Sequence, residues 1–222
     1  MANKILFLDR DGTINISGPD GYVSDPRHFH YMPGIFDVCR VATEKGYKIV
    51  VITNQTGIGW GNYTERDMQL LHQSMWDKFQ AEGVPLTDIF YSTDPDSPYR
   101  KPSAGMFLLA KEKYGLSNQD MLASFAIGDR EKDAMAALSA GVGNIIYFQS
   151  PQVMNRQWQI VEKSAHECAE ELKKIKETFQ TLAIITFLIQ HESDAPKQPI
   201  PIANRAHITV INDYRQLHGR IR

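Results

Sequence analysis

A short apolar run that ends in acids and a glycine constrains the fold of this 222-residue chain more than any other stretch. Residues 5–8 read Ile-Leu-Phe-Leu, and Asp9, Asp11 and Gly12 follow directly. A run that is apolar at every position is typical of a strand buried on both faces, as in a parallel α/β sheet. Carboxylates cannot lie inside such a strand, so we expect both at its carboxyl end, where open α/β sheets bind ligands.

Apolar runs of this kind alternate along the chain with patterns of helical period, which predicts a parallel sheet flanked by helices. Further strands are expected at residues 47–53, 86–91, 124–127, 143–148 and 206–211. Helices are expected within residues 33–46, 64–83, 103–114 and 129–141. Residues 14–32 are rich in Gly, Pro, Asp and aromatic residues instead, and we expect them to form an ordered loop over the site.

Three segments of different character organise the chain. Residues 1–150 carry the alternating pattern and are expected to form one α/β domain. Residues 151–204 are expected to form a helical insertion followed by a Pro-rich linker. Residues 205–222 are expected to return to the domain as a final strand and a short helix.

The insertion contains a pattern that predicts one long helix over Ser164–Gln190, with Ser164 and Glu167 as a capping box and apolar residues at heptad-like steps. Such a helix would be about 40 Å long. Its last part, residues 182–189, is apolar on nearly every face. It could pack on its own chain, residues 183–189 could instead form a strand, or the helix could pair with a second subunit as a homodimer.

Composition narrows the possible partners and compartments. Hydrophobic residues make up 42% of the chain, enough for a substantial core, and the net charge of -2 provides no basic surface for nucleic acid. No secretory signal or apolar run of membrane-spanning length is visible, so we expect a cytoplasmic protein without a membrane partner. Cys39 and Cys168 are the only cysteines and indicate neither a disulfide framework nor a cysteine zinc site.

Polar groups suited to phosphate chemistry follow three of the other predicted elements. Thr53 and Asn54 begin a glycine-bearing turn whose hydroxyl and N–H groups could hold a phosphate, and Lys101 at the start of a helix could reach an anion. Asp129 and Asp133 form a second acid pair, suited to a hard divalent cation. Each also has an ordinary explanation, as a turn, a helix cap or a solvated lysine.

The order of these groups resembles motifs I to IV of the haloacid dehalogenase (HAD) superfamily of phosphohydrolases, over roughly the first two-thirds of the chain. The resemblance implies a Rossmann-like core in which Asp9 attacks phosphorus and Asp11 protonates the leaving group and then activates water. It also implies that Thr53, Asn54 and Lys101 hold the phosphoryl oxygens. Only a loop and one helix separate motifs I and II, so no large cap domain is expected.

The same resemblance implies a Mg²⁺ site. Its expected residues are Asp9, Asp11, Asp129 and Asp133, with the main-chain carbonyl of Asp11 as that residue's ligand and Asp133 orienting the metal waters or the lysine. Related enzymes carry a Cys/His zinc loop just before the motif lysine. Here Ser92–Tyr99 contains neither Cys nor His, so zinc is not expected.

Within the superfamily, four stretches resemble the branch of histidinol-phosphate phosphatase and heptose-bisphosphate phosphatase. They are Asp9–Asn15, Gly21–Val23, Thr53–Gly59 and Arg100–Pro102. This implies a phosphorylated sugar as substrate, first D-glycero-D-manno-heptose 1,7-bisphosphate and second histidinol phosphate. Substrate contacts are expected from Arg10, Asn54, Gln55 and Arg100. Removal of 3′-phosphates from DNA and a non-catalytic phosphate-binding module are the remaining alternatives.

Overall fold

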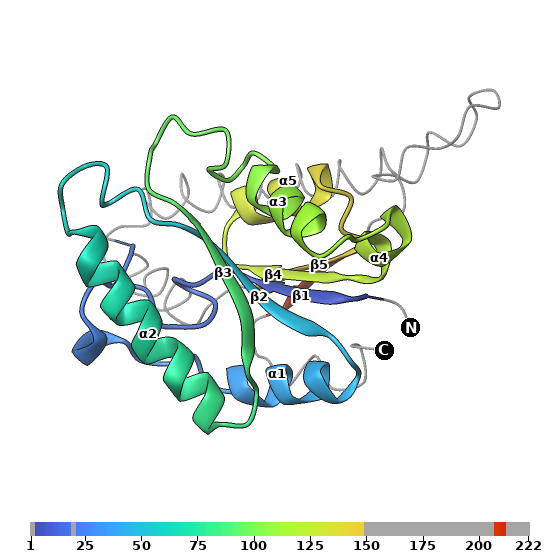
Figure 1. Ribbon diagram of the computed structural model, residues 1–222, viewed down its shortest axis with the longest axis horizontal. Helices are drawn as coiled ribbons and strands as arrows, with labels where there is room; N and C mark the ends of the chain where they lie inside the picture. The colour runs from blue at the N-terminus through green and yellow to red at the C-terminus, as the bar shows by residue number, and fades with distance from the viewer. Residues whose placement is uncertain (1–2, 19–20, 149–206, 212–222) are drawn as a thin grey trace, which may run out of the picture.

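The computed structural model describes residues 3–18, 21–148 and 207–211, which form a six-stranded parallel sheet with helices on both faces (Figure 1). The strands are β1 (Ile5–Leu8), β2 (Lys48–Asn54), β3 (Leu86–Ser92), β4 (Phe125–Gly128), β5 (Asn144–Phe148) and β6 (His207–Ile211). All neighbouring strands pair in parallel. The predicted fold class, a parallel sheet flanked by helices, is confirmed, and each strand lies within one residue of its predicted bounds.

The helices divide between the two faces of the sheet. In Figure 1, α1 (Ile35–Glu44) and α2 (Glu65–Ala81) lie below it, and α3 (Gly105–Lys113), α4 (Asn118–Ala123) and α5 (Glu131–Ser139) lie above it. The sequence pattern predicted all of these except α4. Six residues are too few for a 3.6-residue period to stand out, although the capping box of Ser117 and Asp120 marks its start.

Alternate residues of β1 belong to two hydrophobic cores. Leu6 and Leu8 pack in the core between the sheet and helices α1 and α2, whereas Ile5 and Phe7 pack in the core between the sheet and helices α3 and α5. Each of the four side chains is at most 1% exposed, so β1 is the fully buried central strand that its composition predicts. Cys39 of α1 is buried in the first core as a small apolar residue.

The strand order creates the place where a ligand can bind. The order is β3-β2-β1-β4-β5-β6, so the chain runs from β1 toward one edge and returns at β4 toward the other. In open α/β sheets, ligands bind outside the carboxyl ends of the strands at this reversal. The last residues of β1 and β4 lead directly to Asp9 and Asp129, so the acids predicted from sequence flank the reversal point.

The loop between β1 and α1 is held by internal contacts where the structure describes it. It contains a short 3-10 helix, η1 (Pro26–His28), and bridges between Asn15 and both Asp11 and Tyr31. The Tyr31 ring lies 4.9 Å from the Phe36 ring of α1, measured between centroids. These contacts fit the predicted ordered loop, and η1 is the one regular element among its described residues.

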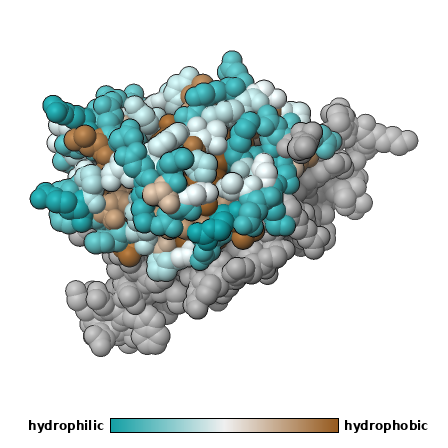
Figure 2. All heavy atoms as spheres, turned by 60° about the horizontal axis from the view of Figure 1, so that its bottom comes forward, coloured by the Kyte–Doolittle hydropathy of each residue, from teal (hydrophilic) through white to brown (hydrophobic). Residues whose placement is uncertain are grey.

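Hydrophilic side chains predominate over the described part of the face in Figure 2, with hydrophobic side chains in small groups between them. None of the described helices is long and apolar enough to cross a membrane. The predicted helix over Ser164–Gln190, the Pro-rich linker and the final short helix lie outside the described residues. The division into three segments and the homodimer therefore stay predictions.

Helix α2 begins with a capping box that can be tested directly. Thr64 Oγ1 accepts from the Asp67 N–H at 3.2 Å, and Asp67 Oδ2 accepts from the Thr64 N–H at 2.9 Å. Thr64→Ala should lower the free energy of unfolding by about 1 kcal/mol, because the Asp67 N–H loses its side-chain acceptor. Thr64→Ser keeps the hydroxyl and should stay near wild type in urea denaturation. An equal loss in both variants would attribute the effect to the lost methyl group.

Candidate active site

Four acidic and basic side chains from separate parts of the chain meet at the carboxyl edge of the sheet. Their exposed fractions are Asp9 8%, Lys101 1%, Asp129 8% and Asp133 5%. Asp9 follows β1 and is fixed by the hydrogen bond from its N–H to the Ile127 carbonyl at 2.9 Å. The structure thus brings the predicted motif residues together in one buried, highly charged site.

Lys101 is the cation of this site. Its Nζ lies 2.6 Å from Asp9 Oδ1 and 2.7 Å from Asp133 Oδ1, and it donates to the Ile52 carbonyl at 2.6 Å. Burial by itself lowers the pKa of the Lys101 ammonium, but the carboxylates of Asp133 and Asp9 outweigh burial and leave the pKa above its usual value. Lys101 is therefore a charged ammonium that faces the predicted nucleophile.

Asn54 was predicted to contact substrate, but its side chain is bonded to the backbone of Lys101. Its Oδ1 accepts from the Lys101 N–H at 2.9 Å, and its Nδ2 donates to the Lys101 carbonyl at 2.9 Å. Both ends of the amide thus hold the backbone of the lysine. This contact joins the end of β2 to a loop 47 residues later, so no local sequence signal could have indicated it.

Asp9, Asp129 and Asp133 form a cluster that suits a divalent cation. One ligand oxygen from each lies within 4.8 Å of the others. Burial, followed by the charges of Asp9 and Asp133, raises the pKa of Asp129 well above its usual value. Burial is also the main cause that raises the pKa of Asp133, against the lowering effect of Lys101. Packing carboxylates this tightly is costly unless a cation lies between them.

Two further observations support a cation at this cluster. Among the described residues, Asp129 Oδ1 is buried without a hydrogen-bond partner, which leaves an oxygen free to be a ligand. Gly12 has a φ of 91°, and a Cβ there would lie 2.1 Å from Asp129 Oδ2. The chain thus needs glycine beside this carboxylate. Only oxygen donors are present in the cluster, which favours a hard ion such as Mg²⁺ over zinc.

The Asp11 carboxylate lies outside this cluster and accepts four hydrogen bonds. Its Oδ2 accepts from Arg10 Nη2 at 2.7 Å and from Gln55 Nε2 at 3.2 Å. Its Oδ1 accepts from Asn15 Nδ2 at 3.0 Å and from the Val23 N–H at 3.2 Å. The orientation of this carboxyl group is therefore fixed, and its predicted part in metal binding rests on the main-chain carbonyl.

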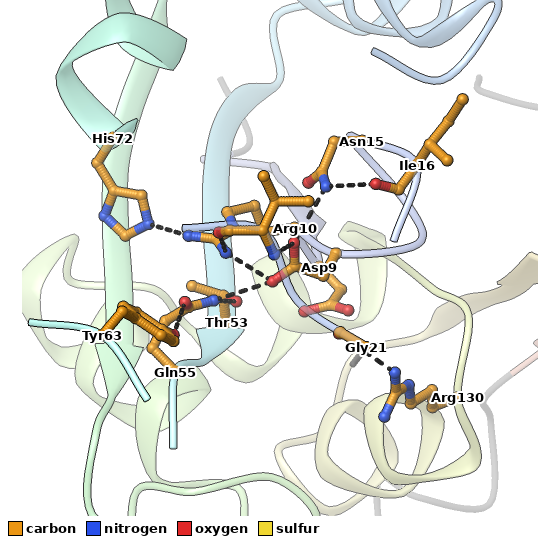
Figure 3. Close-up of polar contacts among 12 residues, drawn as sticks. Asp9, Arg10, Asn15, Ile16, Gly21, Thr53, Gln55, Tyr63, His72 and Arg130 are labelled. Atoms are coloured by element: carbon orange, nitrogen blue, oxygen red, sulfur yellow. Dashed lines mark hydrogen bonds and ion pairs between the residues drawn. The ribbon is translucent and has the colours of Figure 1, made fainter. Parts of the chain in front are cut away.

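Arg10 and Gln55 were predicted to contact substrate, but both side chains are buried in the interior, with 0% and 1% exposure. Figure 3 shows the polar contacts that hold them. Arg10 Nη1 lies 3.1 Å from Nε2 of His72, which α2 supplies. The Gln55 amide donates to Thr53 Oγ1 at 2.8 Å, and Gln55 Oε1 accepts from the Tyr63 hydroxyl at 2.5 Å. Sequence reasoning missed His72 and Tyr63, because a polar residue on a buried helix face gives no signal of its partner.

Other cations lie around the same edge. Arg100 is partly exposed, with its Nε buried and without a hydrogen-bond partner among the described residues. Lys132 of α5, which was not predicted, has its pKa lowered mainly by burial, while Asp9 and Asp133 act in the opposite direction. Arg130 donates to the Gly21 carbonyl at 3.4 Å and so bridges to the loop after β1 (Figure 3).

Comparison of the sequence and the structure with known proteins shows which family the chain belongs to. Residues 4–140 match the model of a family described as polynucleotide kinase 3 phosphatase. The chain therefore belongs to this family of HAD phosphatases. A Burkholderia mallei protein named D-glycero-alpha-D-manno-heptose-1,7-bisphosphate 7-phosphatase is 40% identical over 66% of this chain and 80% of its own. The corresponding beta-anomer enzyme of Helicobacter pylori is 37% identical, over 71% of this chain and 91% of its own.

A solved structure agrees with these relatives. The D,D-heptose 1.7-bisphosphate phosphatase of B. bronchiseptica, complexed with magnesium and phosphate, superposes with a TM-score of 0.60 and 28% identity. The superposition covers 66% of this HAD phosphatase and 80% of the other chain. The predicted resemblance to HAD phosphatases, and to the heptose-bisphosphate branch among them, is confirmed.

The His72 ring gives a pH-dependent prediction. Burial, followed by the charge of Arg10, lowers the pKa of His72 from 6.5 to about 3. The folded-state pKa is depressed, so the stability from neutral His72 is present above pH 6.5 and is lost as the pH falls toward 3. Between pH 7.5 and 5.5 this loss should be about 1 kcal/mol. His72→Gln should remove it from urea-unfolding curves, whereas His28→Gln at an exposed position should retain it; identical pH dependence in all three proteins would contradict a buried neutral ring.

Proposed function

We propose that this HAD phosphatase is a Mg²⁺-dependent hydrolase of D-glycero-D-manno-heptose 1,7-bisphosphate, acting through an aspartyl-phosphate on Asp9. The observation that carries the proposal is the Asp9 carboxylate, held 2.6 Å from the Lys101 ammonium and two residues before a separately fixed Asp11. A nucleophile beside a cation, with a second carboxyl group nearby, is what in-line phosphoryl transfer to an aspartate requires. The names of the relatives supply the substrate class.

In this mechanism Asp9 attacks phosphorus, and the Lys101 ammonium neutralises charge on the phosphoryl oxygens. Thr53 and the N–H groups of the turn after β2 hold the same oxygens. Asp11 gives a proton to the leaving sugar oxygen, then takes one from the water that hydrolyses the aspartyl-phosphate. Asp9, Asp129 and Asp133, with the Asp11 carbonyl, would hold Mg²⁺, which offsets negative charge when bound.

The substrate is proposed from the relatives together with the cations at the site. Arg100 adjoins Lys101 and has a buried Nε without a partner among the described residues, so we assign it to a substrate phosphate or hydroxyl. Both anomers occur among the substrates named for the relatives, so the proposal covers both. Phosphorylated sugars do not cross membranes unaided, so the proposal places the enzyme in the cytoplasm.

A panel of phosphate esters tests this function. With Mg²⁺, we expect kcat/KM for one anomer of the heptose bisphosphate to exceed that for histidinol phosphate and a 3′-phosphorylated oligonucleotide by about 100-fold, as expected when a site bonds the substrate's hydroxyl groups. Asp9→Asn should abolish turnover, because an amide cannot attack phosphorus. The control Asp37→Asn changes an exposed carboxylate of α1 and should be fully active. Similar low rates on all three esters would refute the substrate, and an active Asp9→Asn would refute the aspartyl-phosphate.

Metal content gives a separate prediction. Activity should disappear on dialysis against a chelator and return with Mg²⁺, and the purified protein should contain no stoichiometric zinc. Asp129→Asn should raise the Mg²⁺ concentration needed for half-maximal rate, because the ligand oxygens lose a charge. Elemental analysis and magnesium titration measure both effects. One zinc per chain that survives dialysis would contradict this prediction and would indicate that histidines such as His28 and His30 bind the metal.

A further inference from the structure

Arg10 separates the two acids of the site in sequence, but its side chain is turned into the protein. The residue is 0% exposed, so its guanidinium cannot touch a substrate in the crevice. Its Nη2 donates to Asp11 Oδ2 and to the Val23 carbonyl, both at 2.7 Å. Its Nη1 lies 3.1 Å from His72 Nε2, as Figure 3 shows. One buried cation thus joins the predicted acid–base residue, the loop after β1 and helix α2.

His72 is suited to hold this cation because its Nε2 can accept a hydrogen bond from the guanidinium. A guanidinium donates through every N–H and is always charged, so His72 Nε2 must carry the lone pair and Nδ1 the proton. The ring is 7% exposed and lies 5.9 Å from the Tyr91 ring, edge-on. Among the described residues, Arg10 and Tyr91 both contact it. Helix α2 is in turn fixed by buried Met68 and Met75, one turn before and one turn after His72, so the acceptor has a rigid base.

A second hydrogen bond, from Gln55 Nε2, reaches the same carboxylate oxygen of Asp11. The Tyr63 hydroxyl donates to Gln55 Oε1, which turns the Gln55 Nε2 toward Asp11 Oδ2 and Thr53 Oγ1. The Arg10 contact is shorter, at 2.7 Å against 3.2 Å, and is charge-assisted. Arg10 is therefore the stronger of the two restraints on Asp11.

We propose that Arg10, held by His72, is a positioning residue that sets the direction in which Asp11 presents its carboxyl group to the leaving oxygen. The inference rests on the acid–base role given to Asp11 above. It replaces the substrate contact expected for Arg10 from sequence. The Val23 contact makes the same guanidinium fix the loop beside the carboxyl group, so loop and acid are set together.

The proposal predicts a dependence on the leaving group. An alkyl alkoxide must be protonated as it leaves, whereas 2,4-dinitrophenolate leaves readily without a proton. A misdirected Asp11 should therefore slow the cleavage of an alkyl ester far more than the cleavage of 2,4-dinitrophenyl phosphate. Release of the leaving group in a single turnover isolates this step from the later attack of water, in which Asp11 also takes part.

The experiment compares His72→Gln with His72→Leu in the full chain with Mg²⁺. Gln offers a carbonyl oxygen near the place of Nε2 and should stay within a few-fold of wild type on both esters. The alkyl ester is the one that wild type hydrolyses fastest in the panel above. Leu removes the acceptor and should lower the rate of leaving-group release from this ester about 10-fold, with KM unchanged. Its rate with the dinitrophenyl ester should change little. Arg10→Lys loses the planar fork of the guanidinium, and its rate with the alkyl ester should fall further, by up to ~10²-fold, which is the smallest loss typical of removing a general acid or base.

Retained cleavage of the dinitrophenyl ester shows that each variant is folded and that Asp9 works. Arg10→Ala adds a second arm, since free guanidinium at a non-denaturing concentration should restore the alkyl-ester rate and ammonium should not. Equal slowing on both esters, or a raised KM with unchanged kcat, would overturn the positioning role. A wild type that cleaves neither ester would instead overturn the proposed function, which keeps the two failures distinct.

Discussion

The site depends on the ammonium of Lys101, which lies between the carboxylates of Asp9 and Asp133 at 2.6 and 2.7 Å. Three acids whose oxygens lie within 4.8 Å of one another repel strongly where water is largely excluded. If all three are ionised they carry three negative charges, and Lys101 cancels one. The two negative charges that remain match the two positive charges of one Mg²⁺, so the lysine and a divalent ion together would make the cluster neutral. Burial, followed by repulsion from Asp9 and Asp133, accordingly raises the pKa of Asp129 in the protein alone.

The sequence predicted those parts of the fold that depend on short-range pattern. Buried strands such as β1 and β2 are apolar at nearly every position, and their turns carry the polar residues, so both their existence and their carboxyl ends could be inferred. The same reasoning placed Asp9, Lys101 and Asp129 at one edge, because parallel strands bring all their carboxyl ends to that edge. Helix α4 was not predicted, because it is shorter than two turns and shows no helical period in the sequence.

Side-chain direction beyond the strand ends could not be inferred in the same way. The alternation of a strand tells which face a residue occupies, but it ends where the strand ends, and Arg10 and Gln55 lie just past that point. Both are polar residues in phosphate motifs, which favoured a substrate contact. The structure turns both inward, because buried partners elsewhere in the chain bind them. His72 Nε2, 62 residues along, accepts from Arg10, and the Tyr63 hydroxyl, 8 residues along, donates to Gln55 Oε1. Such pairings are properties of the folded chain and leave no mark in a single sequence.

The two buried cations next to the acids differ in chemistry as well as in position. Lys101 makes contact through a single nitrogen, so one ammonium can reach Asp9, Asp133 and the Ile52 carbonyl at once and could still turn toward an incoming phosphoryl group. Arg10 presents a rigid fork, whose Nη2 meets Asp11 while Nη1 meets His72. A point charge suits a nucleophile whose partner changes during the reaction, and a planar fork suits a carboxyl group that must keep one direction. The assignment of lysine to Asp9 and arginine to Asp11 therefore follows from what each acid has to do.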